Sequence, residues 1–127
     1  MSSVAGHLEL TLPPDPASVA AARAAVLEAL PDLDAERENT VRLLISELVT
    51  NALRHGDGGG PVELHASWNS KVRVEVRDQG DGFIPAPRGK PLEEPGGFGL
   101  FLVGSLADRW GVDSDDSTIV WFELNGT

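Results

Sequence analysis

The chain has 127 residues and a formal net charge of −10, with 20 acidic residues against 10 lysines and arginines. This length suits one domain and is too short for two, and the acidic balance argues against a role that depends on neutralising nucleic-acid phosphates. The sequence has no cysteine, which excludes disulfides, thiolate metal sites and cysteine nucleophiles. No apolar run reaches the length of a membrane span and the first residues lack the pattern of a signal peptide, so we expect a cytoplasmic protein.

The first half of the chain predicts one strand and two helices. Residues 8–12 alternate apolar and polar, which is the pattern of a half-buried strand. Asp15 followed by Pro16 is typical of a helix start, and apolar residues recur at helical spacing from there to Pro31. A second helix is expected over 34–56, because its apolar residues recur at intervals of three and four.

The second half predicts further strands and a third helix. Residues 62–68 and 72–76 alternate and predict two strands joined by a tight turn at 69–70. A helix is expected from the glycines at 96–99 to about Trp110, where Gly111 would end it. A short strand near Val112 and a last strand over 118–124 are also expected, the last because of its β-branched and aromatic residues.

Three polar residues are spaced four apart in the second predicted helix: Glu47, Asn51 and His55. On a helical wheel they fall along one edge of the apolar stripe. A carboxylate and a carboxamide at this spacing can reach one ligand together. The alternative is an ordinary solvated helix end.

Two glycine-rich segments lie on either side of the proline-rich stretch 84–95. The first contains Asp78, Gly80 and Gly82 and directly follows a predicted strand. Its carboxylate can accept a hydrogen bond from an exocyclic amine, and its glycines let the backbone approach a flat ligand; a simple turn is the alternative. The second contains Gly97 and Gly99 at a predicted helix start, where free N–H groups suit phosphates; a packing cluster of glycines is the alternative.

In order and spacing, these three motifs resemble the N box and the two glycine boxes of the GHKL (histidine kinase-like) ATPase superfamily. Within it, the actinobacterial anti-sigma factor serine/threonine kinases are similar to this chain at residues 46–56, 99–103, 108–111 and 120–123. The resemblance implies an α/β (α+β) two-layer sandwich of the Bergerat type, with helices on one face of a mixed, mostly antiparallel sheet. It also implies a single ATP-binding domain over residues 1–127, with an ATP lid at about 84–96.

The resemblance implies a role for each residue of these motifs. Glu47 would be the general base that takes a proton from the attacking hydroxyl, and Asn51 would ligate Mg²⁺. Asp78 would accept a hydrogen bond from the adenine amino group and so select ATP over GTP. The other residues expected to contact ATP are His55, Gly80, Gly82, Gly97, Gly99, Leu100, Phe101 and Thr118.

The function implied is that of an ATP-binding anti-sigma factor in a partner-switching system. It would phosphorylate a serine or threonine of an anti-anti-sigma (STAS-type) protein, sequester a sigma factor, and form a homodimer without binding nucleic acid or membrane directly. Pro95 and Phe98 stand where relatives often carry a phosphate-clamping arginine, which leaves open a nucleotide-gated binding module with weak or no kinase activity. A complete histidine kinase is disfavoured, because none of the three histidines lies in a phosphoacceptor helix.

Overall fold

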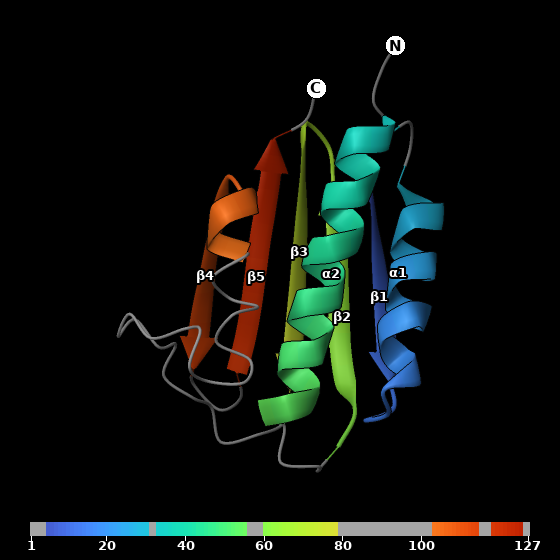
Figure 1. Cartoon of the computed structure of the whole chain (residues 1–127), viewed down its shortest axis with the longest axis vertical. Coiled ribbons are helices and arrows are strands. Elements are labelled where there is room, and N and C mark those ends of the chain that lie inside the picture. The colour runs from blue at the N-terminus through green and yellow to red at the C-terminus, as the bar shows by residue number, and fades with distance from the viewer. Residues whose placement is uncertain (1–4, 31–32, 56–59, 79–102, 115–117, 126–127) are drawn as a thin grey trace.

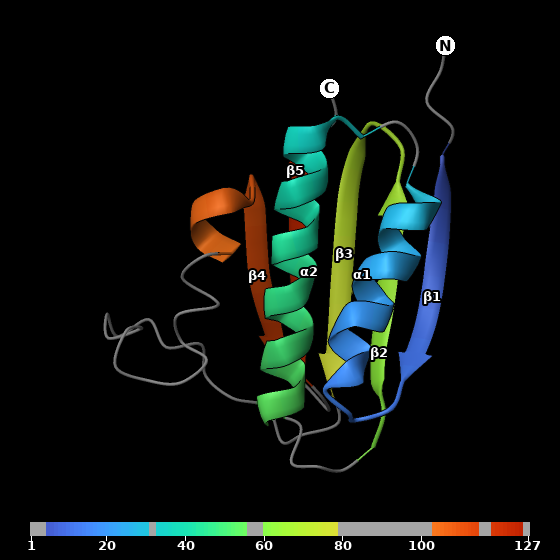
Figure 2. The ribbon, with the colours of Figure 1, turned by 45° about the vertical axis from the view of Figure 1, so that its right-hand side comes forward.

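Two helices and a sheet form a two-layer sandwich (Figure 1). The computed structural model describes residues 5–30, 33–55, 60–78, 103–114 and 118–125. Both helices cover the same face of the sheet (Figure 2), which confirms the predicted fold class. Within these ranges the elements are β1 (Gly6–Leu12), α1 (Ala17–Ala29), α2 (Ala35–His55), β2 (Val62–Trp68), β3 (Lys71–Asp78), β4 (Arg109–Ser114) and β5 (Thr118–Asn125).

Both helices begin where their capping residues predict. The Asp15 carboxylate accepts a hydrogen bond from the backbone N–H of Ala17 at 2.8 Å, and the Asp34 carboxylate accepts one from the N–H of Arg37 at 2.8 Å. Each bond satisfies an N–H group that the first helical turn leaves without an intrahelical partner.

In the described ranges, no helix has the length and apolar character needed to cross a lipid bilayer.

The strands follow the order β1-β2-β3-β5-β4, and all four pairings among these strands are antiparallel. Alternate residues of each strand face the helices, and each large apolar side chain buried there contributes roughly 1.5 to 3 kcal/mol. A slip of one residue would turn this apolar row to the opposite face, so burial fixes the register. The core at the centre of the sandwich includes Leu44, Ile45, Leu48 and Val49 of α2, Leu64 of β2, Val74 and Val76 of β3, and Val120 and Phe122 of β5.

One predicted helix ends earlier along the chain than expected. A helical turn covers 103–106, but Trp110 and Gly111 belong to β4, so the expectation of a helix to about Trp110 was wrong. The short strand expected near Val112 is confirmed and begins at Arg109. Gly111 lies opposite Trp121 of β5, and a Cβ atom at position 111 would stand 2.7 Å from the indole ring. Gly111 therefore makes room for a cross-strand indole instead of ending a helix.

Candidate functional site

A pair of polar residues lies at the end of the core-facing rows of the adjacent strands β3 and β5. Asp78, the last residue of β3, pairs directly with Thr118, the first residue of β5. Both continue rows that are otherwise apolar, such as Val74 and Val76 on β3. Asp78 is only 2% exposed and Thr118 is fully buried. A buried carboxylate beside a buried hydroxyl is costly unless partners satisfy both groups.

The buried hydroxyl of Thr118 is available for a ligand. Among the described residues it has no hydrogen-bond partner, although its oxygen is buried. Because a hydroxyl can both donate and accept a hydrogen bond, it can pair with a donor or an acceptor group of a ligand. The strand end therefore offers a ligand two different polar groups side by side, one from β3 and one from β5.

Asn51 is the most unusual residue of α2. Its side chain is fully buried, and in the described ranges neither its amide nitrogen nor its amide oxygen has a hydrogen-bond partner. An amide left in this state costs about 1 to 3 kcal/mol. Leu48, one turn before Asn51, and Ala52, directly after it, are also buried, so this face of the helix packs on the sheet. A ligand bound at this end of the helix could satisfy both groups of the amide.

Glu47 precedes Asn51 by one helical turn and is half-buried. Burial raises the pKa of its carboxyl group above the ordinary value, because the charged form loses water contacts. His55 is the last residue of α2, and its side chain lies outside the described structure. Along the polar edge predicted from the helical wheel, burial therefore increases from Glu47, which is half-buried, to Asn51, which is fully buried.

The chain brings these groups to one end of the molecule. The C-terminal end of α2, the C-terminal end of β3 and the first residues of β5 all lie at the lower end of the sandwich in Figure 1. Asn51, Asp78 and Thr118 belong to those three ends. Six of the residues predicted to contact a nucleotide lie outside the described residues, namely Gly80, Gly82, Gly97, Gly99, Leu100 and Phe101, as does the predicted lid.

Metal binding at this end would depend on Asn51 and on the ligand. Among the described residues, no three histidine, aspartate or glutamate side chains gather closely enough to hold an ion by themselves. An amide oxygen is a hard ligand that suits Mg²⁺, an ion that usually takes its other ligands from phosphates and water. The orphaned amide of Asn51 therefore fits a magnesium ion that arrives with a phosphate ligand.

Sequence reasoning did not single out one buried charge, that of Glu123 on β5. It lies on the face of the sheet away from the helices, between cationic residues of β3 and β4. Its partner Arg73 is 50 residues away in the chain. Only the alternation of Lys71, Arg73 and Glu123 with apolar neighbours hints at this shared face.

Comparison with known proteins assigns the family. Residues 12–124 match the model of the histidine kinase-like ATPase domain. The chain belongs to this family. The match begins at the last residue of β1, extends into β5 and includes Asn51, Asp78 and Thr118, so the resemblance deduced from the motifs is confirmed.

Two relatives illustrate the range of the histidine kinase-like ATPase family. The serine-protein kinase RsbW of Halalkalibacterium halodurans is 27% identical, over 63% of this chain and 57% of that protein. A solved histidine kinase domain from the blue-light activated histidine kinase of Erythrobacter litoralis EL346 is 28% identical, with a TM-score of 0.61, over 89% of this chain and 61% of that one. The chain thus spans about three fifths of each of these relatives.

Proposed function

We propose that this chain is an ATP-dependent serine/threonine kinase domain of a partner-switching system. It phosphorylates an anti-anti-sigma protein of the STAS type and sequesters a sigma factor when free. The observation that carries the proposal is the buried amide of Asn51, which has no hydrogen-bond partner in the described ranges. The similarity to a serine-protein kinase supports the choice of substrate residue.

ATP would lie at the end of the sandwich where α2, β3 and β5 meet. Asp78 would accept a hydrogen bond from the adenine amino group, and Thr118 would add its hydroxyl beside it. Asn51 would ligate Mg²⁺, which when bound would neutralise charge on the phosphates. The other proposed contacts to ATP are those of His55, Gly80, Gly82, Gly97, Gly99, Leu100 and Phe101.

Glu47 would act as the general base. Its carboxylate takes the proton of a serine or threonine hydroxyl as the hydroxyl oxygen bonds to the γ-phosphorus and ADP leaves. Two features support this role: Glu47 lies one helical turn from Asn51, and burial raises its pKa. A more basic carboxylate accepts a proton more readily, which favours transfer.

The partners belong to the same proposal. A sigma factor and an anti-anti-sigma protein would compete for this domain in the cytoplasm, and the domain would act as a homodimer. The similarity to RsbW of Halalkalibacterium halodurans supports this scheme.

The experiment combines nucleotide binding with phosphate transfer. Calorimetry with Mg-ATP should show binding by the wild type and strong loss of affinity in Asp78→Asn. Incubation with γ-labelled ATP and candidate anti-anti-sigma proteins should label a serine or threonine, and Glu47→Gln should slow labelling by at least about 100-fold while still binding ATP. Absence of ATP binding by the wild type would overturn the proposal. An unchanged rate of labelling in Glu47→Gln would overturn the role of Glu47.

A second function has one observation in its favour. The chain has Pro95 and Phe98 at the two positions where kinases that it resembles often carry an arginine. Such an arginine could bind the terminal phosphate. Without it, the domain would bind partners in a nucleotide-dependent way with little turnover. In that case ATP would change partner affinity equally in the wild type and in Glu47→Ala, and no partner would become labelled.

A further inference from the structure

β4 forms one edge of the sheet. The strand order β1-β2-β3-β5-β4 leaves its outer side without a neighbouring strand among the described residues (Figure 1). The backbone N–H and C=O groups on such a side can pair with a further strand. No proline interrupts β4, so every residue from Arg109 to Ser114 keeps its N–H group. The edge of β4 is therefore open to the addition of a strand from another chain.

The side chains of β4 form two rows. Trp110 and Val112 lie opposite core residues of β5, so this row is on the side of the sheet that carries the helices. Arg109, Gly111 and Asp113 alternate with them and lie on the outer face. Along the strand, the outer row therefore has a cation, a glycine and an acid in that order.

This pattern is complementary to itself. When two copies of β4 pair antiparallel around a twofold axis at Gly111, Arg109 of each copy lies opposite Asp113 of the other. On the opposite face, Trp110 of each copy lies opposite Val112 of the other. Pairs of opposite charge and pairs of an aromatic with a β-branched residue both stabilise antiparallel sheets. The same short strand thus supplies both halves of an interface.

Charge complementarity selects one register and one edge. A shift of two residues in either direction keeps each row on its face, but it leaves Arg109 without an acidic partner inside β4. The other edge strand, β1, carries Glu9 but no lysine or arginine, so its pairing with a second copy offers no such ion pair. β4 is therefore the edge whose sequence suits a second copy of the chain.

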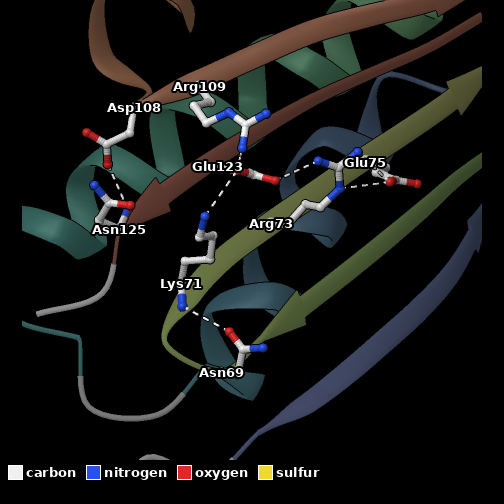
Figure 3. A network of polar contacts seen from close by, with 8 residues as sticks. All are labelled: Asn69, Lys71, Arg73, Glu75, Asp108, Arg109, Glu123 and Asn125. Carbon is white, nitrogen blue, oxygen red and sulfur yellow. Dashed lines mark hydrogen bonds and ion pairs between the residues drawn. The ribbon is translucent and has the colours of Figure 1, made fainter.

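Arg109 and Asp113 are both accessible at this edge. The side chain of Arg109 is 66% exposed, and Figure 3 shows it directed toward Glu123 of β5, with Nη1 3.3 Å from Oε1. A guanidinium has five N–H donors, so this contact leaves donors for a second acceptor. Asp113 is exposed and lies opposite an apolar residue of β5, Ile119. In the pairing, Arg109 lies between Glu123 of its own chain and Asp113 of the other copy.

Trp110 is incompletely covered in the single chain. Its side chain is 36% exposed, although a Cβ atom at Gly104 would stand only 3.0 Å from the indole Nε1. Val112 is half-buried. A second copy would cover both side chains, because the indole of each copy meets the valine of the other. The close approach of Gly104 already restricts the indole, so less freedom is lost on association.

We propose that two copies of this chain associate through their β4 edges, antiparallel around Gly111, and join their five-stranded sheets into one continuous sheet. This inference rests on the proposed function only in that it names the surface of the proposed homodimer; the association needs neither ATP nor another protein. Two chains of net charge −10 repel each other at long range. At about 0.15 M salt the Debye length is about 8 Å, so distant repulsion is screened more than the directly opposed ion pairs.

Disulfide cross-linking tests both the interface and its register. The chain has no cysteine, so Arg109→Cys and Asp113→Cys each carry a single thiol. In the proposed register these two positions are direct neighbours in different copies, with Cα atoms about 4.5 to 5.5 Å apart, which suits a disulfide. Two thiols at the same position would be about 14 Å apart, which is too far. An oxidised equimolar mixture should therefore cross-link strongly, and each variant alone should not.

The matched control for cross-linking uses the other edge. His7→Cys and Thr11→Cys have the same spacing at exposed positions of β1, and their mixture should not cross-link.

Sedimentation equilibrium at about 0.15 M salt measures the association itself. The wild type should dimerise, and Asp113→Arg should raise the dissociation constant at least about tenfold, because it opposes two pairs of arginines. Glu28→Arg makes the same change of charge at an exposed position of α1 and should leave the dissociation constant unchanged. Circular dichroism verifies that each variant is folded, and Asp113→Asn, which only removes the ion pairs, serves if Asp113→Arg is not.

Three results would overturn the proposal: a wild type that stays monomeric, a dimer in which positions 109 and 113 do not cross-link, or cross-linking through β1 instead. A dimer without kinase activity would leave this inference intact and count only against the proposed function. A monomer that phosphorylates its partner would do the reverse.

Discussion

Asp78 and Thr118 are direct cross-strand partners at the final position of the β3–β5 register. Val72, Val74 and Val76 of β3 face the core, so this row changes from apolar to polar only at its end. Strand pairing also fixes the two side chains relative to one another, because neighbours on one face of an antiparallel pair lie close together. A ligand at this end would meet a rigid pair of polar groups.

Thr118→Val tests the hydroxyl. Valine keeps the branched shape, and it removes a buried hydroxyl that has no partner in the described ranges. We expect the free energy of unfolding without ligand to stay equal or to rise by about 1 kcal/mol, while ATP affinity falls about fivefold. Urea unfolding and calorimetry measure the two quantities. Thr118→Ser keeps the hydroxyl and should retain most of the affinity; loss of stability in Thr118→Val with unchanged ATP affinity would make the hydroxyl structural.

Asn51→Leu separates stability from ligand binding more sharply. A leucine would replace an amide whose two polar atoms are buried and unpartnered among the described residues, and Leu48 shows that the neighbouring site on this helix accepts leucine. We expect the ligand-free protein to gain about 1 kcal/mol, because the unsatisfied amide disappears. Mg-ATP binding should be lost. Thermal unfolding with and without Mg-ATP gives both results in one series.

The matched control is Asn39→Leu, at an exposed position of the same helix. It should leave Mg-ATP binding unchanged. Destabilisation of the ligand-free protein by Asn51→Leu would show that the amide has a structural role, and retained Mg-ATP binding would remove Asn51 from the proposed site.

Local spacing in the sequence was enough to select two residues of the candidate site. Asn51 stood out because Glu47, Asn51 and His55 recur every four residues, and Asp78 because it follows an alternating strand. Thr118 could be named only through the family resemblance, since its pairing with Asp78 joins residues far apart in the chain.

The features that the sequence did not predict depend on cross-strand neighbours. Trp110 and Gly111 were expected at a helix end because glycine often ends helices. The structure instead places Gly111 under the indole of Trp121. The cluster around Glu123 was missed for the same reason, because Arg73 and Arg109 reach it from two other strands. Local patterns do not indicate which strands will be neighbours.

Gly111→Ala tests the contact between Gly111 and Trp121. A Cβ atom at position 111 would lie 2.7 Å from Cζ2 of the indole, which is closer than real atoms approach. We expect a loss of about 1 to 3 kcal/mol in the free energy of unfolding, because the indole must move. Urea unfolding measures this loss. Gly6 has the same relationship to Trp68 on the opposite edge of the sheet, also at 2.7 Å, so Gly6→Ala should behave alike.

A double variant provides the control for this contact. In Gly111→Ala/Trp121→Leu the smaller side chain should accept the added methyl group. The cost of alanine at 111 should then be clearly smaller than in the wild-type background, and an equal cost in both backgrounds would assign the effect to the glycine backbone instead.

Acid should weaken the sheet through Glu123. The hydrogen bond from Arg73 lowers the pKa of Glu123, burial opposes this, and Arg109 and Lys71 lower it further. A carboxyl group with a lowered pKa in the folded state stabilises that state fully above its ordinary pKa of 4.5, and this stabilisation is lost as the pH falls below that value. Glu123→Gln should therefore be about 1 to 2 kcal/mol less stable than the wild type at pH 7, and the difference should shrink toward pH 3.

Urea unfolding from pH 7 to pH 3 measures this trend. Glu47 contributes with the opposite sign: its pKa is raised, so its carboxyl group favours the folded state less as the pH rises above 4.5. Glu47→Gln should therefore gain stability relative to the wild type between pH 4.5 and pH 7. A cycle of Glu123→Gln with Arg73→Gln isolates the ion pair, because their coupling should become smaller as the pH falls from 7 to 3. Coupling that is equal at both pH values would show that the interaction between the two side chains does not depend on the charge of Glu123.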